Sequence, residues 1–356
     1  MINALIGSSS IKEHFNLIFQ DITDRRDISN IGKWDLYNIW LALRHSVEFL
    51  IKLLRYRPDL IYIPIALGMP GFLRDCLLIF SAIFARRKLI VHFHNSAFGN
   101  FYDTAAPPLK WCIRYILTHT TRAIVLGNNL RCIVRGLVAE DRIAVIPNGL
   151  DQTPFARIEA QALRSPDREF RVTYLGNLTE AKGYWELLEA ASILAQQEPR
   201  VHFIMAGPFY RLDDERRSRA FVKTYHLEAT VSFLGIVLGD EKVKLLQNSD
   251  LFVFPPIARE GQPLVLLEAM AAGLPIITTD QGAIREMVID AENGFIVPTC
   301  DAQAIAEKII LLLRNESLRL RMAEASRDRF FSHYTLERWE EDMVRVFQDA
   351  YYDAHL

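Results

Sequence analysis

The chain has few cysteines, and none of them is arranged for metal binding or redox exchange. Only four occur in 356 residues, at positions 76, 112, 132 and 300. No two of them form a CxxC pair, which argues against the common zinc and dithiol motifs. Their neighbours are largely apolar, as in Cys76-Leu77-Leu78. We therefore expect buried free thiols and a reducing compartment.

Long apolar runs and targeting segments are scarce as well. Residues 1–7 lack both a basic leader and an apolar stretch of signal-peptide length. The longest apolar stretch of the first half, residues 76–85, has about half the length that spans a bilayer. The sequence therefore predicts a cytoplasmic protein without a transmembrane helix. No GxGxxG opens a helix after a predicted strand, which disfavours a nicotinamide-dependent oxidoreductase.

Net charge is small but unevenly distributed. The whole chain carries a formal charge of -2, whereas residues 1–150 carry +7 and residues 151–356 carry -9. A basic half is typical of a surface that meets an anionic partner. Scattered, solvated charge is the alternative interpretation.

Short apolar runs alternate with longer helical patterns through the first half. The runs that predict strands are Leu60–Ile63, Leu89–Phe93, Ala123–Leu126 and Ile143–Ile146. Strands separated by helices are typical of right-handed βαβ units and of a parallel sheet with helices on both faces. A first α/β domain is therefore predicted to end near residues 147–149.

The second half repeats this alternation, with strands predicted at residues 170–175, 201–205, 230–234, 251–254, 275–278 and 295–297. A polar stretch through residues 164–168 is interpreted as a linker. The amphipathic run from Tyr334 to Tyr351 predicts a long helix that begins after a Thr335 cap and crosses back to the first domain. The predicted domains are residues 1–155, residues 156–335 and the returning helix of residues 336–356. Two doubly wound domains of this kind are expected to face a shared cleft.

A strand, a loop and a helix follow one another between residues 251 and 273. Pro263 suits the first turn of a helix, and Gly273 suits its end. The backbone N–H groups of Leu264 and Val265 are then expected to point at a ligand, together with the positive end of the helix dipole. Such a helix start suits a diphosphate.

Two glutamates, Glu260 and Glu268, flank this predicted anion site at a spacing of eight residues. A carboxylate accepts two hydrogen bonds from a vicinal diol, so one glutamate is expected to face a sugar and the other a ribose. On residue types alone there is an alternative. Glu260 would then be a charge near the positive end of a helix, and Glu268 a solvated surface residue.

The segment from Glu260 to Glu268 resembles the E-x7-E motif of the family-4 retaining glycosyltransferases, also called group 1 glycosyl transferases. The resemblance is strong from about residue 58 onward and looser before it. It implies the two-domain GT-B fold and a donor site that includes Gly261 and Gln262. It also implies that Glu260 orients the transferred sugar or stabilises its positive anomeric carbon.

The segment from Gly176 to Gly183 resembles the donor-phosphate loop of that family, in which an Arg and a Lys bind the diphosphate. Lys182 matches the Lys. Asn177 stands where the family has Arg, so a basic residue from elsewhere has to replace that charge or donor binding is weakened. Gly235 and Ile236 resemble the strand end whose backbone reads the nucleobase edge, with a simple strand-to-turn glycine as the alternative.

Two histidines, His92 and His94, lie on the same side of a predicted strand at its carboxyl end. The resemblance implies that His94 contacts the transferred sugar, whereas His92 is interpreted as a satisfied, partly buried histidine. A metal site made from the pair is not expected, because no acidic ligand is nearby in the sequence. The predicted catalytic residues are therefore Glu260, His94 and Lys182, without a metal ion or cofactor.

Members of the family normally open with a strand and a Gly-Gly loop, whereas this chain starts at what resembles the following helix, residues 2–11. The first strand of the N-terminal domain is therefore predicted to be missing. Two explanations are open: an internal start, or an incomplete acceptor domain in a weakened or inactive enzyme.

The resemblance implies transfer of a hexose from a UDP- or GDP-sugar to a saccharide or lipid-linked saccharide in cell-surface polysaccharide or glycan biosynthesis. The alternatives are a nucleotide-sugar epimerase or hydrolase of the same fold and a truncated, non-catalytic partner protein. No nucleic-acid partner is expected. The basic run at residues 86–88 indicates peripheral contact with an anionic membrane at its inner face. Cations at a helix C-terminus are the alternative interpretation.

Overall fold

A computed structural model describes residues 1–23, 35–155 and 169–353. The chain divides into two compact units, each described by itself: unit 1 comprises Met1–Asn148 with Glu337–Leu356, and unit 2 comprises Gly149–Leu336. The predicted linker at residues 164–168 lies outside the described residues.

Unit 1 is built on a four-stranded parallel sheet in the order β1-β2-β3-β4. Its strands are β1 (Leu60–Pro64), β2 (Lys88–Phe93), β3 (Arg122–Val125) and β4 (Ile143–Val145). Five of the six residues of the central strand β2 are buried, which accounts for its unbroken apolar run. Its helices and 3-10 turns are α1 (Ile2–Gly7), α2 (Ser9–His14), α3 (Leu36–Tyr56), α4 (Met69–Phe84), α5 (Phe98–Thr104), α6 (Pro107–Thr118), η2 (Asn128–Val134) and η3 (Glu140–Arg142).

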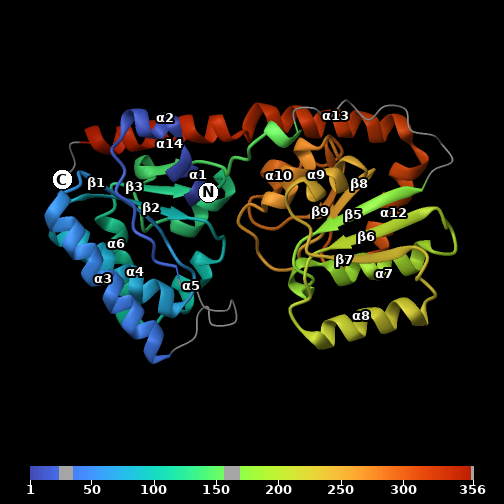
Figure 1. The fold of residues 1–356 in the computed structure, drawn as a ribbon, viewed down its shortest axis with the longest axis horizontal. Helices are drawn as coiled ribbons and strands as arrows, with labels where there is room; N and C mark the ends of the chain where they lie inside the picture. Colours follow the sequence, from blue (N-terminus) through green and yellow to red (C-terminus); the bar gives the residue numbers. More distant parts are fainter. Residues whose placement is uncertain (24–34, 156–168, 354–356) are drawn as a thin grey trace. The chain divides into compact units, whose positions relative to one another are not determined.

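The helix α14 (Leu336–Tyr352) packs on the sheet of unit 1, on the face opposite α3, α4 and α6 (Figure 1). The ring of Phe347 lies 5.7 Å from that of Tyr62 in β1 and 5.6 Å from that of Phe15. The segment after the helix is fixed by an ion pair between Asp353 and Arg122 at the start of β3. Unit 1 is therefore assembled from both ends of the described chain.

Unit 2 is built on a six-stranded parallel sheet in the order β10-β9-β8-β5-β6-β7. Its strands are β5 (Phe170–Leu175), β6 (Val201–Ala206), β7 (Val231–Gly235), β8 (Leu251–Phe254), β9 (Ile276–Thr279) and β10 (Gly294–Val297). Its helices and 3-10 turns are η4 (Thr153–Phe155), η5 (Glu180–Lys182), α7 (Tyr184–Leu194), α8 (Leu212–Thr224), α9 (Gly239–Gln247), α10 (Leu264–Ala271), α11 (Ile284–Met287), α12 (Ala302–Arg314) and α13 (Glu316–His333).

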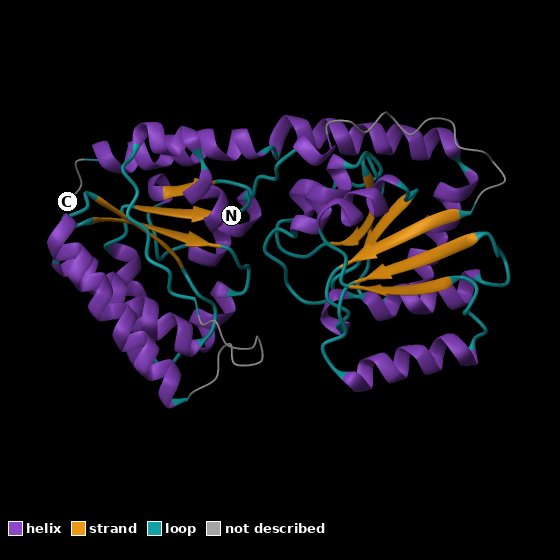
Figure 2. Cartoon of the chain, in the orientation of Figure 1, coloured by secondary structure: helices purple, strands orange, loops and turns teal. Residues whose placement is uncertain are grey.

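The strands of unit 2 all end at one edge of the sheet, where the arrowheads gather in Figure 2. Chain direction across the sheet reverses between β5 and β8, because β6 and β7 follow on one side and β9 and β10 on the other. In open α/β sheets this topological switch point is where ligands bind. The loops after β5 and β8 are therefore the expected place for a site.

All ten predicted strands are present, and each of their boundaries agrees with the sequence-based prediction to within one residue. The start of the chain differs from the prediction, because the single helix expected over residues 2–11 is broken in two. Ser8 leaves helical geometry, and its hydroxyl caps α2 by accepting a hydrogen bond from Ile11 N at 3.1 Å. The described residues before Leu60 contain no strand, and the absence of a first strand relative to the family stays a prediction.

The cysteines are all free, but only part of the expectation about their burial is correct. Cys76 is buried and Cys112 partly buried, whereas Cys132 and Cys300 are exposed because they lie on a 3-10 segment and in a turn at the surface. The Sγ atoms of Cys76 and Cys112 lie 3.6 Å apart, between α4 and α6. None of the helices that the structure describes is long and apolar enough to cross a membrane.

Candidate functional site

The loops that follow β5 and β8 contact each other at the switch point of unit 2. The backbone N–H groups of Ile257 and Ala258 both donate to the carbonyl oxygen of Ala181, at 3.0 Å each. The structure thereby joins residues 176–183 and residues 255–263, which the sequence analysis singled out separately.

Glycines make this approach of loops possible. A Cβ on Gly183 would lie 1.8 Å from the carbonyl oxygen of Pro255, and a Cβ on Gly207 equally close to that of Gly176. A Cβ on Gly282 would lie 1.6 Å from the carbonyl oxygen of Glu260. All three contacts are far shorter than a carbon–oxygen contact allows, so the loops after β5, β6, β8 and β9 are packed backbone to backbone.

Lys182 and Glu260 form an ion pair across this junction. Lys182 closes the short turn η5 after β5, and Glu260 lies on the loop after β8. The Lys182 side chain is 33% exposed and that of Glu260 is 13% exposed, so solvent reaches this ion pair mainly at Lys182. Two of the three predicted catalytic residues are thus in direct contact.

The helix α10 starts at Leu264, with Pro263 at the position before its first residue rather than inside the first turn. No side chain caps this helix start. Leu264 is 40% exposed and Val265 is partly buried, so the first turn reaches the surface. The preceding loop is firmly held, because Gly261 O accepts a hydrogen bond from Ala283 N at 2.9 Å and Gln262 is buried. A helix start without a side-chain cap suits an anion.

Glu268 is not a solvated surface residue, because its relative exposure is 8%. Its Oε1 accepts a hydrogen bond from Lys242 Nζ of α9 at 2.5 Å. Its Oε2 is buried without a hydrogen-bond partner among the described residues. Lys242 could not be identified from the sequence, since no local pattern connects a lysine with a glutamate that lies on another helix.

Asn177, which replaces the family's arginine, is exposed at the start of the loop after β5. Its backbone carbonyl accepts hydrogen bonds from Tyr174 Oη at 3.1 Å and Thr179 N at 2.9 Å. A cation from another element does reach this loop, because Arg217 of α8 forms an ion pair with Glu180. Its guanidinium also lies 3.8 Å from the ring centroid of Trp185.

Gly235 ends β7 in a left-handed conformation with φ of 69°, and nothing lies within 4 Å of where its Cβ would stand. Its carbonyl oxygen accepts a hydrogen bond from Gly207 N at 2.7 Å. Ile236 follows and is 65% exposed. Open space therefore lies beside Gly235, and its contact with a nucleobase stays a prediction.

His94, the third predicted catalytic residue, belongs to unit 1 and follows β2. Its ring lies against that of His92, with centroids 3.9 Å apart and the ring planes inclined by 30°. Burial lowers the pKa of His94 to about 4, and burial also lowers the pKa of His92. Both histidines are therefore neutral at physiological pH.

His92 is fully buried rather than partly buried, because its ring packs against that of Tyr62 on the neighbouring strand β1, with centroids 5.9 Å apart. Its Nδ1 lies 2.7 Å from Tyr62 Oη, which satisfies one ring nitrogen. The Nε2 atoms of His92 and His94 have no hydrogen-bond partner among the described residues. The interpretation of His92 as a satisfied histidine is thus correct for one of its two nitrogens.

The basic run at residues 86–88 does not form one surface patch. Lys88 Nζ donates to the carbonyl oxygens of Tyr351 and Asp353, so this lysine secures the segment after α14. Arg86 and Arg87 follow the C-terminus of α4, where their backbone N–H groups donate to the carbonyl oxygens of Ile83 and Ala82, respectively. The helix C-terminus interpretation therefore describes this run better.

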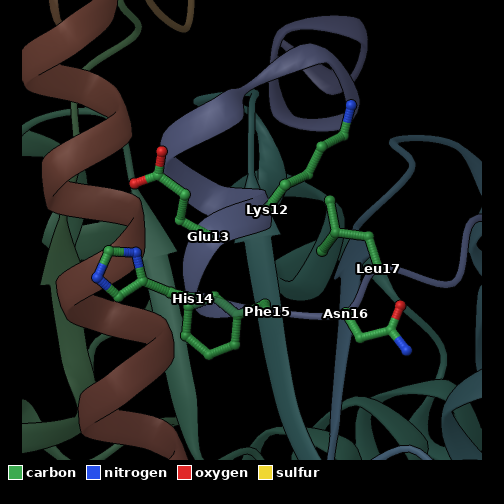
Figure 3. Close-up of a pocket in the computed structure, with 6 residues that line it drawn as sticks. All are labelled: Lys12, Glu13, His14, Phe15, Asn16 and Leu17. Atoms are coloured by element: carbon green, nitrogen blue, oxygen red, sulfur yellow. The ribbon is translucent and has the colours of Figure 1, made fainter.

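A surface hollow in unit 1 is lined by residues Lys12 to Leu17 (Figure 3). The close-up shows the side chains of Lys12, Glu13 and His14 pointing in different directions from α2 rather than toward one point. None of the predicted site residues lines it. This hollow has no arrangement of groups suited to catalysis.

Comparison with known proteins supports the interpretation of unit 2. Residues 156–329 match the family described as glycosyl transferases group 1. The putative colanic acid biosynthesis glycosyltransferase WcaL of Salmonella typhimurium is 32% identical over 176 residues, which are 48% of this chain and 41% of that protein. The phosphatidyl-myo-inositol mannosyltransferase of Mycolicibacterium smegmatis is 36% identical over 177 residues, 49% of this chain and 44% of that protein. The chain thus spans less than half the length of these two relatives.

Similarity to solved structures extends over both units. The crystal structure of Anabaena Alr3699/HepE in complex with UDP covers 86% of this chain with a TM-score of 0.72 and 19% identity, and 82% of that chain is matched. The prediction of two parallel-sheet α/β domains with the GT-B fold is thereby confirmed.

Proposed function

We propose, since residues 156–329 match the glycosyl transferases group 1 family, that this chain is a retaining glycosyltransferase using a UDP- or GDP-sugar. The observation that carries the proposal is the ion pair of Lys182 and Glu260 at the switch point of unit 2. The relatives named for colanic acid and phosphatidyl-myo-inositol chemistry favour polysaccharide or glycolipid biosynthesis. The UDP complex of the Anabaena protein supports a nucleotide-sugar donor.

The diphosphate of the donor is proposed to bind at the start of α10 and against Lys182. A phosphate that binds the Lys182 ammonium breaks the ion pair between Lys182 and Glu260. The carboxylate of Glu260 then accepts hydrogen bonds from the sugar hydroxyls. Donor binding and sugar orientation are coupled in this way. Arg217 neutralises Glu180, which lowers the repulsion between that carboxylate and the diphosphate.

In the proposed reaction the acceptor oxygen bonds to the anomeric carbon on the face from which the diphosphate leaves. The bond between the anomeric carbon and the phosphate oxygen breaks, and the acceptor hydroxyl proton passes to the departing diphosphate. Stabilisation of that leaving group is the main catalytic device, supplied by Lys182 and the α10 N-terminus. No metal ion is required in this scheme. His94 of unit 1, neutral at physiological pH, is proposed to contact the transferred sugar.

Radiolabelled UDP- and GDP-sugars incubated with membrane extract as acceptor source test this proposal. The wild-type chain should transfer label to a product that retains the anomeric configuration, at a rate that EDTA leaves unchanged. Glu260→Ala should lower turnover by about two orders of magnitude or more with an unchanged Tm. Full consumption of the donor in the absence of acceptor would instead identify a hydrolase or epimerase. Near-normal transfer by Glu260→Ala would overturn the assigned site.

Contact with the inner face of an anionic membrane is proposed for α3 rather than for residues 86–88. One stripe of this helix consists of large apolar side chains, each at least 45% exposed: Leu36, Ile39, Trp40, Leu43, Val47, Leu50, Ile51 and Leu54. The charged residues of the helix are three cations, Arg44, Lys52 and Arg55, and one anion, Glu48. These charged residues follow the stripe along one side, where Arg44 pairs with Glu48, and an apolar stripe beside basic residues is typical of a helix that lies in a lipid interface.

Co-sedimentation with vesicles tests this contact. The chain should bind phosphatidylcholine vesicles that contain phosphatidylglycerol more tightly than vesicles of phosphatidylcholine alone. Replacing both Leu43 and Val47 with Gln should lower binding about tenfold or more, whereas Leu212→Gln in unit 2, also at an exposed leucine, should not. A dimer in solution that the double variant abolishes would show that a second copy covers the stripe instead.

A further inference from the structure

Three alternate residues at the carboxyl end of β2 carry buried polar atoms that form no hydrogen bond within the described part of the chain. These residues, called the β2 row below, are His92, His94 and Ser96, and the atoms are the two Nε2 atoms and the serine Oγ. His92 is 0% exposed and Ser96 is 3% exposed. Burying a polar group without a partner costs free energy. Three such groups in a row are therefore expected where a ligand or water supplies the missing partners.

The short helix α1 lies beside the β2 row. In Figure 1 it stands at the edge of the unit 1 sheet toward which the strands point. Burial is the main cause of the lowered pKa of His94, and the positive charge of the Met1 amino group adds to it. The same charge acts on His92, after burial and the neighbouring His94. The start of α1 is thus close to both rings.

The two helices that open the described chain are held very differently. None of residues 2–7, which form α1, is buried. In α2, by contrast, Ile11 is fully buried, and the ring of Phe15 just after it packs against α14. Between the helices, Gly7 has nothing within 4 Å of its Cβ position, and Ser8 leaves helical geometry with a ψ of 123°. Gly7 and Ser8 thus connect a fixed helix to a loosely attached one.

We propose that α1 is a lid that turns about Gly7 and Ser8 and, when open, admits a sugar to His94 and Ser96. Opening exchanges the partly buried side chains of residues 4–6 for hydrogen bonds to groups that the closed lid leaves unpaired. A neutral imidazole nitrogen donates or accepts according to its tautomer, and a serine hydroxyl does both, so these groups suit the hydroxyls of a carbohydrate. The identity of the ligand rests on the proposed function, whereas the lid itself does not.

Diethyl pyrocarbonate tests the lid without any substrate. The reagent acylates neutral imidazole nitrogens with release of ethanol and carbon dioxide, and peptide mass spectrometry measures the labelling of His94. Leu5→Ala removes a partly buried side chain from the lid and should raise the labelling rate about fivefold or more. Ile2→Ala, the matched control at an exposed position of the same helix, should change the rate less than about twofold. Gly7→Ala stiffens the hinge and should lower the rate about twofold or more.

The buried thiol of Cys76 in α4 reports whether unit 1 opens as a whole. Its alkylation rate should be the same in the wild type and in the three variants, because a lid opens without unfolding the core. Equal labelling of His94 in the wild type, Leu5→Ala and Gly7→Ala would overturn the lid. Parallel increases at His94 and Cys76 in Leu5→Ala would overturn it as well.

The KM for the sugar donor tests the ligand separately. A lid that is mostly closed lowers the apparent affinity in proportion to the open fraction. Leu5→Ala should therefore lower this KM, and Gly7→Ala should raise it, by the factors seen in the labelling of His94. Unchanged KM values beside changed labelling would overturn the sugar as the ligand. Absence of transfer by the wild type would refute the proposed function, and the labelling rates would then decide alone whether α1 is a lid.

Discussion

A Cβ added to Gly282 would lie 1.6 Å from the carbonyl oxygen of Glu260. Gly282 follows β9 and has a φ of 57°, so a side chain there is opposed both by the neighbouring loop and by its own backbone conformation. The loop that carries Glu260 is thus positioned by a residue outside the E-x7-E segment.

Gly282→Ala is expected to displace the Glu260 loop. The substitution should lower the free energy of unfolding of the chain by about 2 kcal/mol or more, and sugar transfer should fall with it. Urea denaturation and a transfer assay measure the two effects. Gly136→Ala is the matched control, because Gly136 has a φ of 71° but nothing within 4 Å of its Cβ position. Equal effects of the two variants would show that backbone conformation alone is responsible.

Replacement of Lys182 by Met should lower kcat by about 10²- to 10³-fold, because the leaving diphosphate loses its side-chain cation. Lys182→Arg keeps the charge and should retain more activity than Lys182→Met. Initial rates at saturating donor give kcat directly. A variant Lys182→Met with normal kcat would show that the α10 N-terminus and Arg217 suffice.

The low pKa of His94 predicts a loss of stability in mild acid. Its folded-state pKa is lowered to about 4 from an ordinary value of 6.5. Between these values the unfolded chain binds a proton that the folded chain does not, so the free energy of unfolding falls as pH falls from about 6.5 to 4. The contribution is about 3 kcal/mol at most, at about 1.4 kcal/mol for each pKa unit.

Urea denaturation at pH 7 and pH 4.5 tests this pH dependence. The loss of stability between the two pH values should be smaller in His94→Gln than in the wild type. An identical loss in both proteins would assign the acid sensitivity to other groups, His92 first among them.

Mild oxidation should join Cys76 and Cys112. Their Sγ atoms are already 3.6 Å apart, and both thiols are free. Treatment with diamide should remove two of the four titratable thiols and produce a cross-link that peptide mapping places between α4 and α6. Cys112→Ser should prevent it. Cross-links through the exposed Cys132 or Cys300 to a second molecule would contradict this pairing.

The strands and the donor-site loops were predictable because their signals are local. Leu251–Phe254 is a fully buried apolar run, and the turn glycine Gly183 shows directly in the sequence. Lys242 was not predictable, because its pairing with Glu268 depends on how α9 packs against α10. The exposed positions of Cys132 and Cys300 were missed for a related reason, since apolar neighbours in sequence need not be neighbours in space.

The return of α14 to unit 1 has a consequence for the order in which the chain folds during synthesis. Residues 149–336 form one uninterrupted stretch, so unit 2 can fold as soon as that stretch has left the ribosome. Strands β1 to β4 emerge earlier, but the sheet face that receives Phe347 stays uncovered until α14 has been made. The unit that is translated first is therefore the one completed last.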